Sequence, residues 1–378
     1  MRRSVFLFVS LILILIILNF YFVYAQEWSP PVRITDRCMD NAPRLLAIGD
    51  TLHVVYEDRQ LGWGRYPTYM NYVRSTDAGL NWSTPIHLSS YDEYDRNSTP
   101  RIVGYGSNIM CIWFYAFHSE RGTYIFSATS TDNGQTWTTP QNILGQNDSM
   151  LISVAISNTD DHVNLTASLN LWRCDPLFNI RSTDFGQTWS DPVQITDSVY
   201  CAPGIDQVSF GNLVHLVFEG AHSYHEIAHL DYMKSTDDGL TWSDPVDLKQ
   251  NENDWSGDMS IAVNQAGILG ITWTELDNLY MKLNFDNGEN WGSAKQITND
   301  GNAALPGDIM IYHDDISVAW VTFADTDGNN SDIFYKRSSD YGQDWGCYYW
   351  LDRSFYSSNA PALAESKGKI YAVWHCWS

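Results

Sequence analysis

The chain has 378 residues, of which 44% are hydrophobic and 14% aromatic, so it can bury a large core. It carries 22 Lys and Arg residues against 45 Asp and Glu residues, a formal net charge of −23. Binding to nucleic-acid phosphates needs a basic surface, so this balance argues against a nucleic-acid partner. The acidic residues are scattered among turns, which is typical of a solubilising surface.

Residues 1–25 have the pattern of an export signal. Arg2 and Arg3 form a basic start, an apolar run follows to Val23, and Ala25 ends a small-residue cleavage site. The run is also long enough to span a bilayer, so an uncleaved anchor is the alternative. We expect an exported protein, secreted or otherwise extracytoplasmic, with one domain over residues 26–378. The membrane would be contacted only through this segment, if it stays uncleaved.

Residues 42–88 contain a unit of four predicted strands. An apolar strand at 42–49 is followed by an alternating strand at 51–58, and then by strands at 68–74 and 84–88. The same order recurs along the chain, with an aromatic residue at the matching place of the second strand. We interpret this aromatic stripe as packing between neighbouring units. Its members are Tyr56, Trp113, Phe218, Trp273, Trp320 and Trp374.

The segment between the third and fourth strands reads S-x-D-x-G-x-x-W and occurs six times, with Asn284 in place of Ser in the fifth copy; we call it the repeat turn. Its Ser and Asp can bond nearby backbone N–H groups, its Gly can take a positive φ, and its Trp can pack beneath the turn. Because an active site does not need six copies of one acid, we interpret the aspartates as structural. The repeat-turn residues are Asp77, Gly79, Trp82, Asp132, Gly134, Trp137, Asp184, Gly186, Trp189, Asp237, Gly239, Trp242, Asp286, Gly288, Trp291, Asp340, Gly342 and Trp345.

The repeat-turn aspartates are 49 to 55 residues apart. A period near fifty in an all-strand sequence predicts an all-β propeller with one four-stranded blade per repeat. Residues 28–36 match a fourth strand, and residues 359–374 match the first two strands at 41–56. We therefore expect the two ends of the chain to share a seventh blade, which lacks a third strand and turn or is cut short. A six-bladed ring is the alternative.

Six cysteines in an exported chain permit three disulfides, whose connectivity the sequence does not define. Cys38 and either Cys347 or Cys376 would lie near the seam of the ring, where a disulfide is a hypothesis. The other cysteines are Cys111, Cys174 and Cys201.

Residues 225–229 read H-E-x-x-H, a zinc-protease motif that requires a helix. Here the motif runs into a predicted third strand, so His225 and His229 would not chelate one ion. No C-x-x-C or D-x-D-x-D-G pattern occurs either. The sequence therefore predicts no metal site and no cofactor.

The repeat turns, at this interval, resemble the Asp-box (BNR) repeats of the sialidase superfamily. The resemblance covers nearly all of the chain beyond the signal segment. It implies a propeller whose repeat turns lie away from the active site. Sialidases proper also have six blades, an arginine triad, a Tyr–Glu nucleophile pair and an Asp acid. Those residues do not map here: Asn41 stands at the first Arg position, and no Arg occurs between Arg181 and Arg337.

By the repeat, the ligand face is built from the loops between strands two and three and from those between blades. Aromatic and charged residues in these loops suit stacking and hydrogen bonding to a sugar. The ligand-binding candidates are Arg59, Arg65, Tyr66, Arg121, Trp172, Arg173 and Glu219.

Two classes of function are open. The first is a carbohydrate-binding or carbohydrate-active protein, glycosidase-like if it is an enzyme, acting on a glycan or glycoconjugate. The second is a non-enzymatic scaffold for a protein partner. A third reading within the first class is an exo-α-sialidase with displaced catalytic residues. The sequence assigns no catalytic residue.

Overall fold

The computed structural model describes residues 28–35, 40–59, 68–89, 96–116, 123–145, 151–169, 176–197, 204–220, 229–249, 257–299, 301, 303–323, 331–352 and 358–376. The chain divides into a short unit, Met1–Val32, and a large unit, Arg33–Ser378. The proposed export signal lies outside the described residues. Within them the secondary structure is all β, and no helix has the length and apolarity to cross a membrane.

Six antiparallel groups of four strands make up most of the large unit, and we call them blades 1 to 6; one parallel pair, Thr68 with Arg96, joins the first two into a single eight-stranded sheet. Their strands are β1 (Asp40–Ile48), β2 (Thr51–Arg59), β3 (Thr68–Ser75), β4 (Ile86–His87); β5 (Arg96–Tyr105), β6 (Asn108–Ala116), β7 (Thr123–Ser130), β8 (Gln141–Leu144); β9 (Leu151–Thr159), β10 (His162–Leu169), β11 (Leu177–Ser182), β12 (Val193–Gln194); β13 (Ile205–Phe210), β14 (Leu213–Gly220), β15 (His229–Ser235), β16 (Val246–Asp247); β17 (Gly257–Val263), β18 (Leu269–Glu275), β19 (Asn278–Asn284), β20 (Lys295–Gln296); and β21 (Ala303–Tyr312), β22 (Asp315–Phe323), β23 (Ser331–Ser338), β24 (Tyr349–Trp350).

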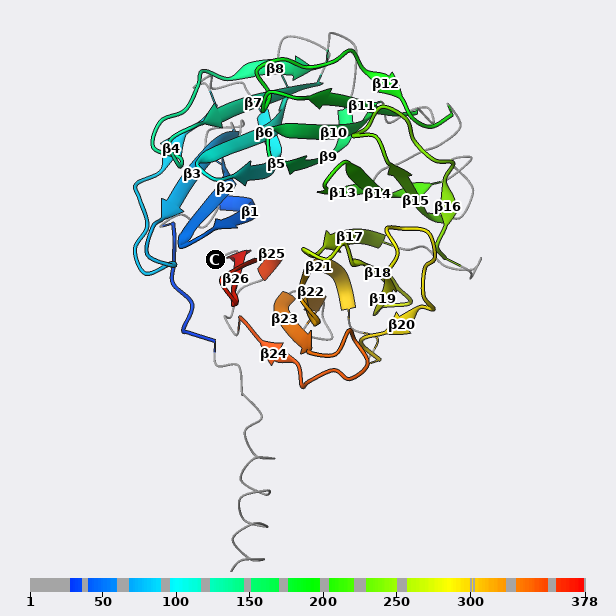
Figure 1. Cartoon of the computed structure of the whole chain (residues 1–378). Helices are drawn as coiled ribbons and strands as arrows, with labels where there is room; N and C mark the ends of the chain where they lie inside the picture. Colours follow the sequence, from blue (N-terminus) through cyan, green and yellow to red (C-terminus); the bar gives the residue numbers. More distant parts are fainter. Residues whose placement is uncertain are drawn as a thin grey trace, which may run out of the picture. The chain divides into compact units, whose positions relative to one another are not determined.

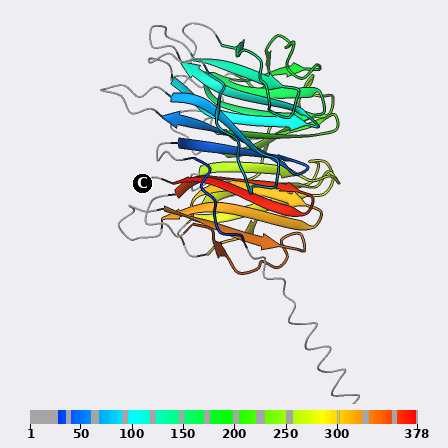
Figure 2. The same ribbon diagram turned by 90° about the vertical axis from the view of Figure 1, so that its left-hand side faces the viewer.

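The blades follow one another around a ring, with the first strand of each on the inside (Figure 1). The predicted β-propeller is therefore correct. In the side view of Figure 2 the strands of neighbouring sheets lie in layers across the unit. Each inner strand runs from the side where β2 ends and β3 begins, which we call the loop side, to the side of the repeat turns, the turn side.

The last two strands, β25 (Ser358–Ser366) and β26 (Lys369–Cys376), form a two-stranded terminal sheet. It lies between blade 6 and blade 1, where β25 contacts both β21 and β1. Both strands were predicted, but residues 28–35 form no strand. A fourth strand pairs with a third strand in every blade, and the terminal sheet has no third strand to pair with. The ring thus has six complete blades, the alternative above, closed by a partial sheet.

Each repeat turn is held by its own side chains, as predicted. In the first copy, Ser75 Oγ donates to Asp77 Oδ1 at 2.8 Å and accepts from the Gly79 N–H at 2.8 Å. The Asp77 carboxylate also accepts the Asn81 N–H at 2.8 Å. In the fifth copy the Asn284 amide replaces the Ser hydroxyl, and its Oδ1 accepts the Gly288 N–H at 2.7 Å.

All six repeat-turn glycines have positive φ, and so does the residue before each of them. That preceding position holds no β-branched residue, because such side chains strain most in the left-handed region. Its occupants are Ala78, Asn133, Phe185, Asp238, Asn287 and Tyr341.

Each blade packs its repeat-turn tryptophan against the preceding sheet, and every blade except blade 3, whose second strand has no aromatic residue, packs its stripe aromatic there as well. The Trp137 ring of blade 2 meets the Tyr72 ring of blade 1 edge-on, with centroids 4.7 Å apart. Trp113, also of blade 2, is buried in the same cluster as Val55 and Tyr72. Tryptophans of the turn are only partly buried, whereas the aromatic stripe from Tyr56 to Trp320 is buried throughout. The stripe is inter-blade packing, as interpreted from the sequence.

A cation one residue before the repeat-turn Ser fastens some blades to the next turn. Arg74 Nη1 donates to the Asn133 carbonyl at 2.7 Å, Arg181 Nη1 to Asp238 at 3.3 Å, and Lys234 Nζ to Asn287 at 3.2 Å. We call this contact the cation clasp. It satisfies a carbonyl of the next blade's turn with a charged donor, a bond stronger than a neutral one.

Replacing Gly134 by Ala should destabilise the ring strongly. A Cβ there would lie 1.8 Å from the Tyr72 hydroxyl, and φ is +78°. The Tyr72 ring is fully buried, and its hydroxyl shares a 2.6 Å hydrogen bond with His53, so it cannot move aside. We expect a loss of about 3 kcal/mol in urea unfolding, from overpacking added to backbone strain.

Gly106→Ala is the control for that substitution. Its φ is +55°, yet nothing lies within 4 Å of the added Cβ. We expect a loss of about 1 kcal/mol from backbone strain alone. Equal losses for the two variants would contradict the packing of turn on blade described here.

Candidate functional site

The structure describes two of the seven predicted ligand-binding residues. Arg59 ends β2 of blade 1, and Glu219 lies near the end of β14 of blade 4, both on the loop side as predicted. The other candidates lie outside the described residues: Arg65, Tyr66, Arg121, Trp172 and Arg173. His229 begins β15 and contacts Asp247 at 3.2 Å, which confirms its place on a third strand rather than a helix.

Arg59 belongs to a charged group that we call the loop-side cluster. The Glu57 carboxylate, 5% exposed, accepts the Thr99 N–H of blade 2 at 2.9 Å and lies 3.6 Å from Arg59. Asn41 Nδ2 approaches the same carboxylate at 3.5 Å. Thr99 reaches it from a bulge in β5 with φ of 54°, a strained value for a β-branched residue.

His375 of the terminal sheet completes the loop-side cluster. Burial, with the nearby Arg59 charge, lowers the pKa of His375 to about 4, so its imidazole is neutral at physiological pH. The cluster therefore joins blade 1, blade 2 and the terminal sheet. It contains one buried carboxylate, one cation and one neutral imidazole, a set suited to hydrogen bonding with hydroxyl groups.

Glu219 is the counterpart of Glu57 in blade 4, since each follows the second-strand aromatic. It is 4% exposed, and its backbone N–H bonds the Gly204 carbonyl at 3.0 Å. A Cβ at Gly204 would lie 3.6 Å from the Glu219 carboxyl. The glycine thus lets the carboxyl pack close to the backbone at the start of β13.

A second group of charged residues lies on the inner strands and was not predicted; we call it the axial ring. Its residues lie at the same height along the axis of the ring. Each one pairs, across the first and second strands of its blade, with the residue that precedes the second-strand aromatic. The pairs are Arg44 with Val55, Arg101 with Ile112, Asp206 with Val217, Ser260 with Thr272, and Asp308 with Ala319. Strand register therefore brings two cations and two carboxyls to the same level of the ring.

The two carboxyls of the axial ring are linked through Ser260. Its hydroxyl donates to Asp308 Oδ1 at 3.1 Å and also contacts Asp206. Asp206 Oδ2 accepts the Ile261 N–H of blade 5 at 2.9 Å, and Asp308 Oδ2 accepts the Leu363 N–H of the terminal sheet at 2.8 Å. The carboxyls are thus fixed in position by the neighbouring inner strands.

The surroundings favour protonation of this pair. Burial raises the pKa of Asp308 to about 6, and repulsion from Asp206 acts in the same direction while Arg44 opposes it. Burial also raises the pKa of Asp206, against the effects of its backbone bond and of Arg101. Both side chains keep some exposure to solvent. A carboxyl that exchanges a proton near pH 6 is suited to acid–base chemistry.

A sequence signal for the axial ring exists, but it is weak. Each charged residue follows closely on a proline at the start of a first strand: Arg44 and Arg101 directly, Asp206 and Asp308 within three residues. A charge inside an otherwise apolar strand needs a partner. The sequence does not show which strands bring those partners together.

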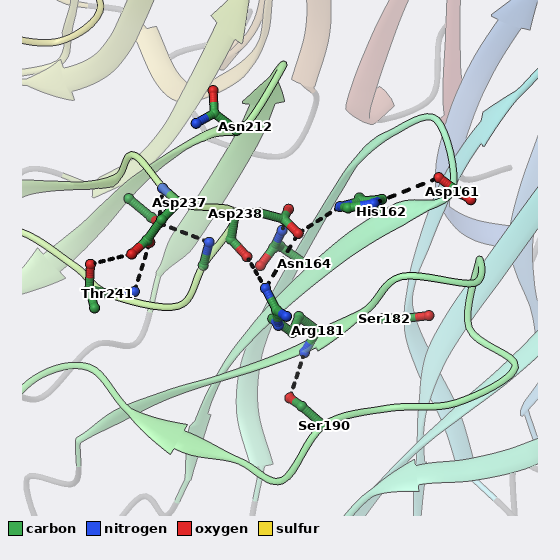
Figure 3. Close-up of polar contacts among 12 residues, drawn as sticks. Asp161, His162, Asn164, Arg181, Ser182, Ser190, Asn212, Asp237, Asp238 and Thr241 are labelled. Carbon is green, nitrogen blue, oxygen red and sulfur yellow. Dashed lines mark hydrogen bonds and ion pairs between the residues drawn. The ribbon is translucent and has the colours of Figure 1, made fainter.

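The turn side carries a polar cluster of its own, between blades 3 and 4 (Figure 3). The Asp238 carboxylate accepts from His162 Nδ1 at 2.7 Å and Asn164 Nδ2 at 2.9 Å, and lies 3.5 Å from Arg181. Asp237 is turned into its own repeat turn, where it accepts the Thr241 hydroxyl at 2.6 Å. These side chains bond one another across the blade interface, so this cluster is structural.

The repeat-turn aspartates are poor candidates for acid catalysis. Hydrogen bonds from the Thr136 side chain and backbone hold the pKa of Asp132 below its ordinary value, and hydrogen bonds within the turn also lower the pKa of the other five repeat-turn aspartates.

Among the residues that the structure describes, no group of His, Cys, Asp or Glu is arranged to hold a metal ion. Cys347 is exposed and unbridged; Cys38 lies outside the described residues, so the seam disulfide stays a prediction.

No protein-family profile matches the sequence, and no curated protein sequence matches it. Among solved structures, an α-L-arabinofuranosidase from Fusarium graminearum, in complex with an iminosugar inhibitor, has a TM-score of 0.57 at 14% identity, over 82% of this chain and 95% of that one. A protein of unknown function from Dyadobacter fermentans has a TM-score of 0.54 at 14% identity, over 75% and 91%.

The NanB sialidase of Streptococcus pneumoniae, in its optactamide complex, has a TM-score of 0.50 at 13% identity. That match covers 92% of this chain and 66% of NanB. At such identities the likeness shows the fold alone. The fold is that of a sialidase-like β-propeller, as the resemblance of the repeat turns implied.

Asp308 should make the protein less stable as the pH rises. A carboxyl whose pKa is raised from 3.8 to about 6 by folding stabilises the folded state fully below pH 4. That contribution is lost as the pH rises through 6. Wild-type protein should therefore lose thermal stability between about pH 4 and about 7, and Asp308→Asn, which keeps an acceptor for the Leu363 N–H, should lose less over that range. Parallel pH profiles for the two proteins would show that Asp308 titrates normally.

Proposed function

We propose that this chain is an exported Asp-box propeller of the sialidase superfamily that binds a saccharide at the loop side of its axis. We further propose that it hydrolyses glycosidic bonds, with Asp206 and Asp308 as its carboxyl pair. The supporting observation is the convergence of these two carboxyls on Ser260 at one level of the inner strands. A structural neighbour that acts on a glycan supports glycosidase chemistry for this fold, but it does not indicate which residues would carry it.

The geometry suits glycoside hydrolysis in its usual two-carboxyl form. Two carboxyls that contact one hydroxyl have oxygens no more than about 6 Å apart. Glycosidases use one carboxyl to protonate the leaving oxygen and the other as nucleophile or base. Because neighbouring carboxyls repel each other when both are ionised, this pair would retain one proton at mildly acidic pH, below about 6. The protonated member would then be the acid and the ionised member its partner.

The other charged residues have supporting roles in this proposal. Arg44 and Arg101 share the level of the carboxyls and would limit the repulsion between them. The loop-side cluster of Asn41, Glu57, Arg59 and His375 would bond sugar hydroxyls. Glu219 would do the same from blade 4.

Glycan binding without turnover is a second candidate, and one observation favours it. Both axial carboxyls accept a backbone N–H from the next sheet, which is what a purely structural carboxylate does. Such a propeller would keep the loop-side cluster as a lectin-like site. A protein-interaction scaffold remains the reading if no glycan binds.

The test uses protein from Gln26 to Ser378, screened on fluorogenic glycosides and on a glycan array. We expect turnover that falls at least about 100-fold in Asp206→Asn and in Asp308→Asn while glycan binding persists. The control is Asp77→Asn, which changes a carboxylate on the turn side.

The outcomes separate the candidates. Turnover unaffected by either axial substitution would overturn the assignment of the carboxyls. Release of sialic acid would indicate sialidase activity with displaced residues. Binding without turnover would support the lectin-like reading, and folded protein that neither binds nor cleaves would favour the scaffold.

A further inference from the structure

Blade 6 departs from the other five blades at its outer edge. In register, Phe334 of β23 pairs with Trp350 of β24, whereas the fourth-strand partner is polar in every other blade. Those polar partners are His87, Asn142, Gln194, Asp247 and Gln296. Two residues before Trp350, Tyr348 occupies a place that is Pro in four blades and Ala in one: Pro85, Pro140, Pro192, Pro245 and Ala294. Blade 6 thus has two large aromatic rings, Tyr348 and Trp350, at positions where the other five blades have compact or polar residues.

These rings continue an aromatic row from the core to the rim of blade 6. The Trp320 and Phe334 centroids are 5.8 Å apart with planes at 26°, and those of Phe334 and Trp350 are 5.5 Å apart at 17°. Tyr348 meets Phe334 at 5.4 Å and 61°. Exposure rises along the row from 5% at Trp320 to 41% at Trp350, with 62% at Tyr348. The row therefore leaves ring surface open to solvent at the rim.

The size of this surface decides what it could bind. Two aromatic side chains at these exposures offer about 200 Å² of surface. A stable protein interface needs about 800 Å² from each partner, so two rings do not make a protein-docking site. The net charge of −23 also disfavours an anionic ligand. A small, neutral ligand with a flat apolar face remains.

A sugar ring has those properties. The C–H bonds on one face of a pyranose carry slight positive charge, which the negative face of an aromatic ring attracts. The hydroxyls at the sugar's edge remain in water or bond polar tips such as the Tyr348 hydroxyl. We propose that Tyr348 and Trp350 form a rim platform that binds a neutral polysaccharide chain, separately from the axial site. This platform would hold the protein on a glycan whether or not the axis is catalytic.

The repeat itself supplies the variants for a test. Trp350→Gln installs the residue of blades 3 and 5, and Tyr348→Pro installs the residue found in four blades. Both restore the common pattern, so neither should prevent folding. The control is Phe285→Ala, which removes an aromatic residue that is 60% exposed at the fifth repeat turn and packs on Tyr341 rather than on the rings of the rim platform.

The experiment measures retention in affinity gels that contain xylan, arabinan, β-glucan or starch, together with quenching of tryptophan fluorescence by soluble fragments. We expect the wild type and Phe285→Ala to be retained by at least one of these glycans. Trp350→Gln should bind it at least about 10-fold more weakly, with unchanged thermal unfolding. Any turnover of small fluorogenic glycosides should stay the same in Trp350→Gln and fall in Asp308→Asn, which keeps the two sites distinguishable.

Three results would overturn the rim platform. The first is a wild type that none of the four polysaccharides retains. The second is equal retention of the wild type, Trp350→Gln and Tyr348→Pro. The third is concentration-dependent dimerisation that Trp350→Gln abolishes, because the rings would then be covered by a second copy of the chain.

Discussion

The seating of each repeat turn on the preceding blade is the contact on which the ring depends. Gly134 shows the two reasons why the turn requires a glycine. Its φ is +78°, and the Tyr72 hydroxyl occupies the space that a side chain would fill. Gly288 stands in the same relation to Tyr232. One local motif therefore shapes its own hairpin and also fixes the distance to its neighbour. The cation clasp strengthens this contact at three interfaces without changing its geometry.

Because the repeat pattern lies outside the first strands, the sequence of these inner strands can differ from blade to blade. The outer parts of each blade are committed to turns, stripe aromatics and clasps, whereas the first strand need only pair with the second. Arg44, Asp206 and Asp308 therefore stand on inner strands at no cost to the repeat. Strand register then gathers them at one level. The charged residues at the axis thus come from segments far apart in sequence, while the repeat residues hold the blades together.

The sequence predicted the frame well because the frame is local. Ser75, Asp77 and Gly79 bond within five residues, so their spacing alone determines the turn. The axial ring was missed because Asp206 and Asp308 come from different blades and are linked only through Ser260 of the blade between them. The fourth strand expected at 28–36 failed for a related reason, since a strand needs a partner and the terminal sheet lacks the third strand. Arg59 and Glu219 were placed on the correct side because the alternation of strands determines the side.

Arg337 marks the place where the repeat ends. In blades 1, 3 and 4 the equivalent cation reaches the turn of the next blade, but no repeat turn follows blade 6. Arg337 instead pairs with Asp315 of its own blade. The junction with the terminal sheet therefore has no cation clasp, like those between blades 2 and 3 and between blades 5 and 6. Hydrogen bonds from the Leu363 N–H to Asp308, from Ser331 to the Ser358 carbonyl and from Trp374 to Asp352 cross it instead. The terminal sheet also has two strands where each blade has four, and in an array of neighbouring units the unit with the fewest paired strands opens first. Amide hydrogens of β25 and β26 should accordingly exchange with solvent ahead of those in blades 1 to 5.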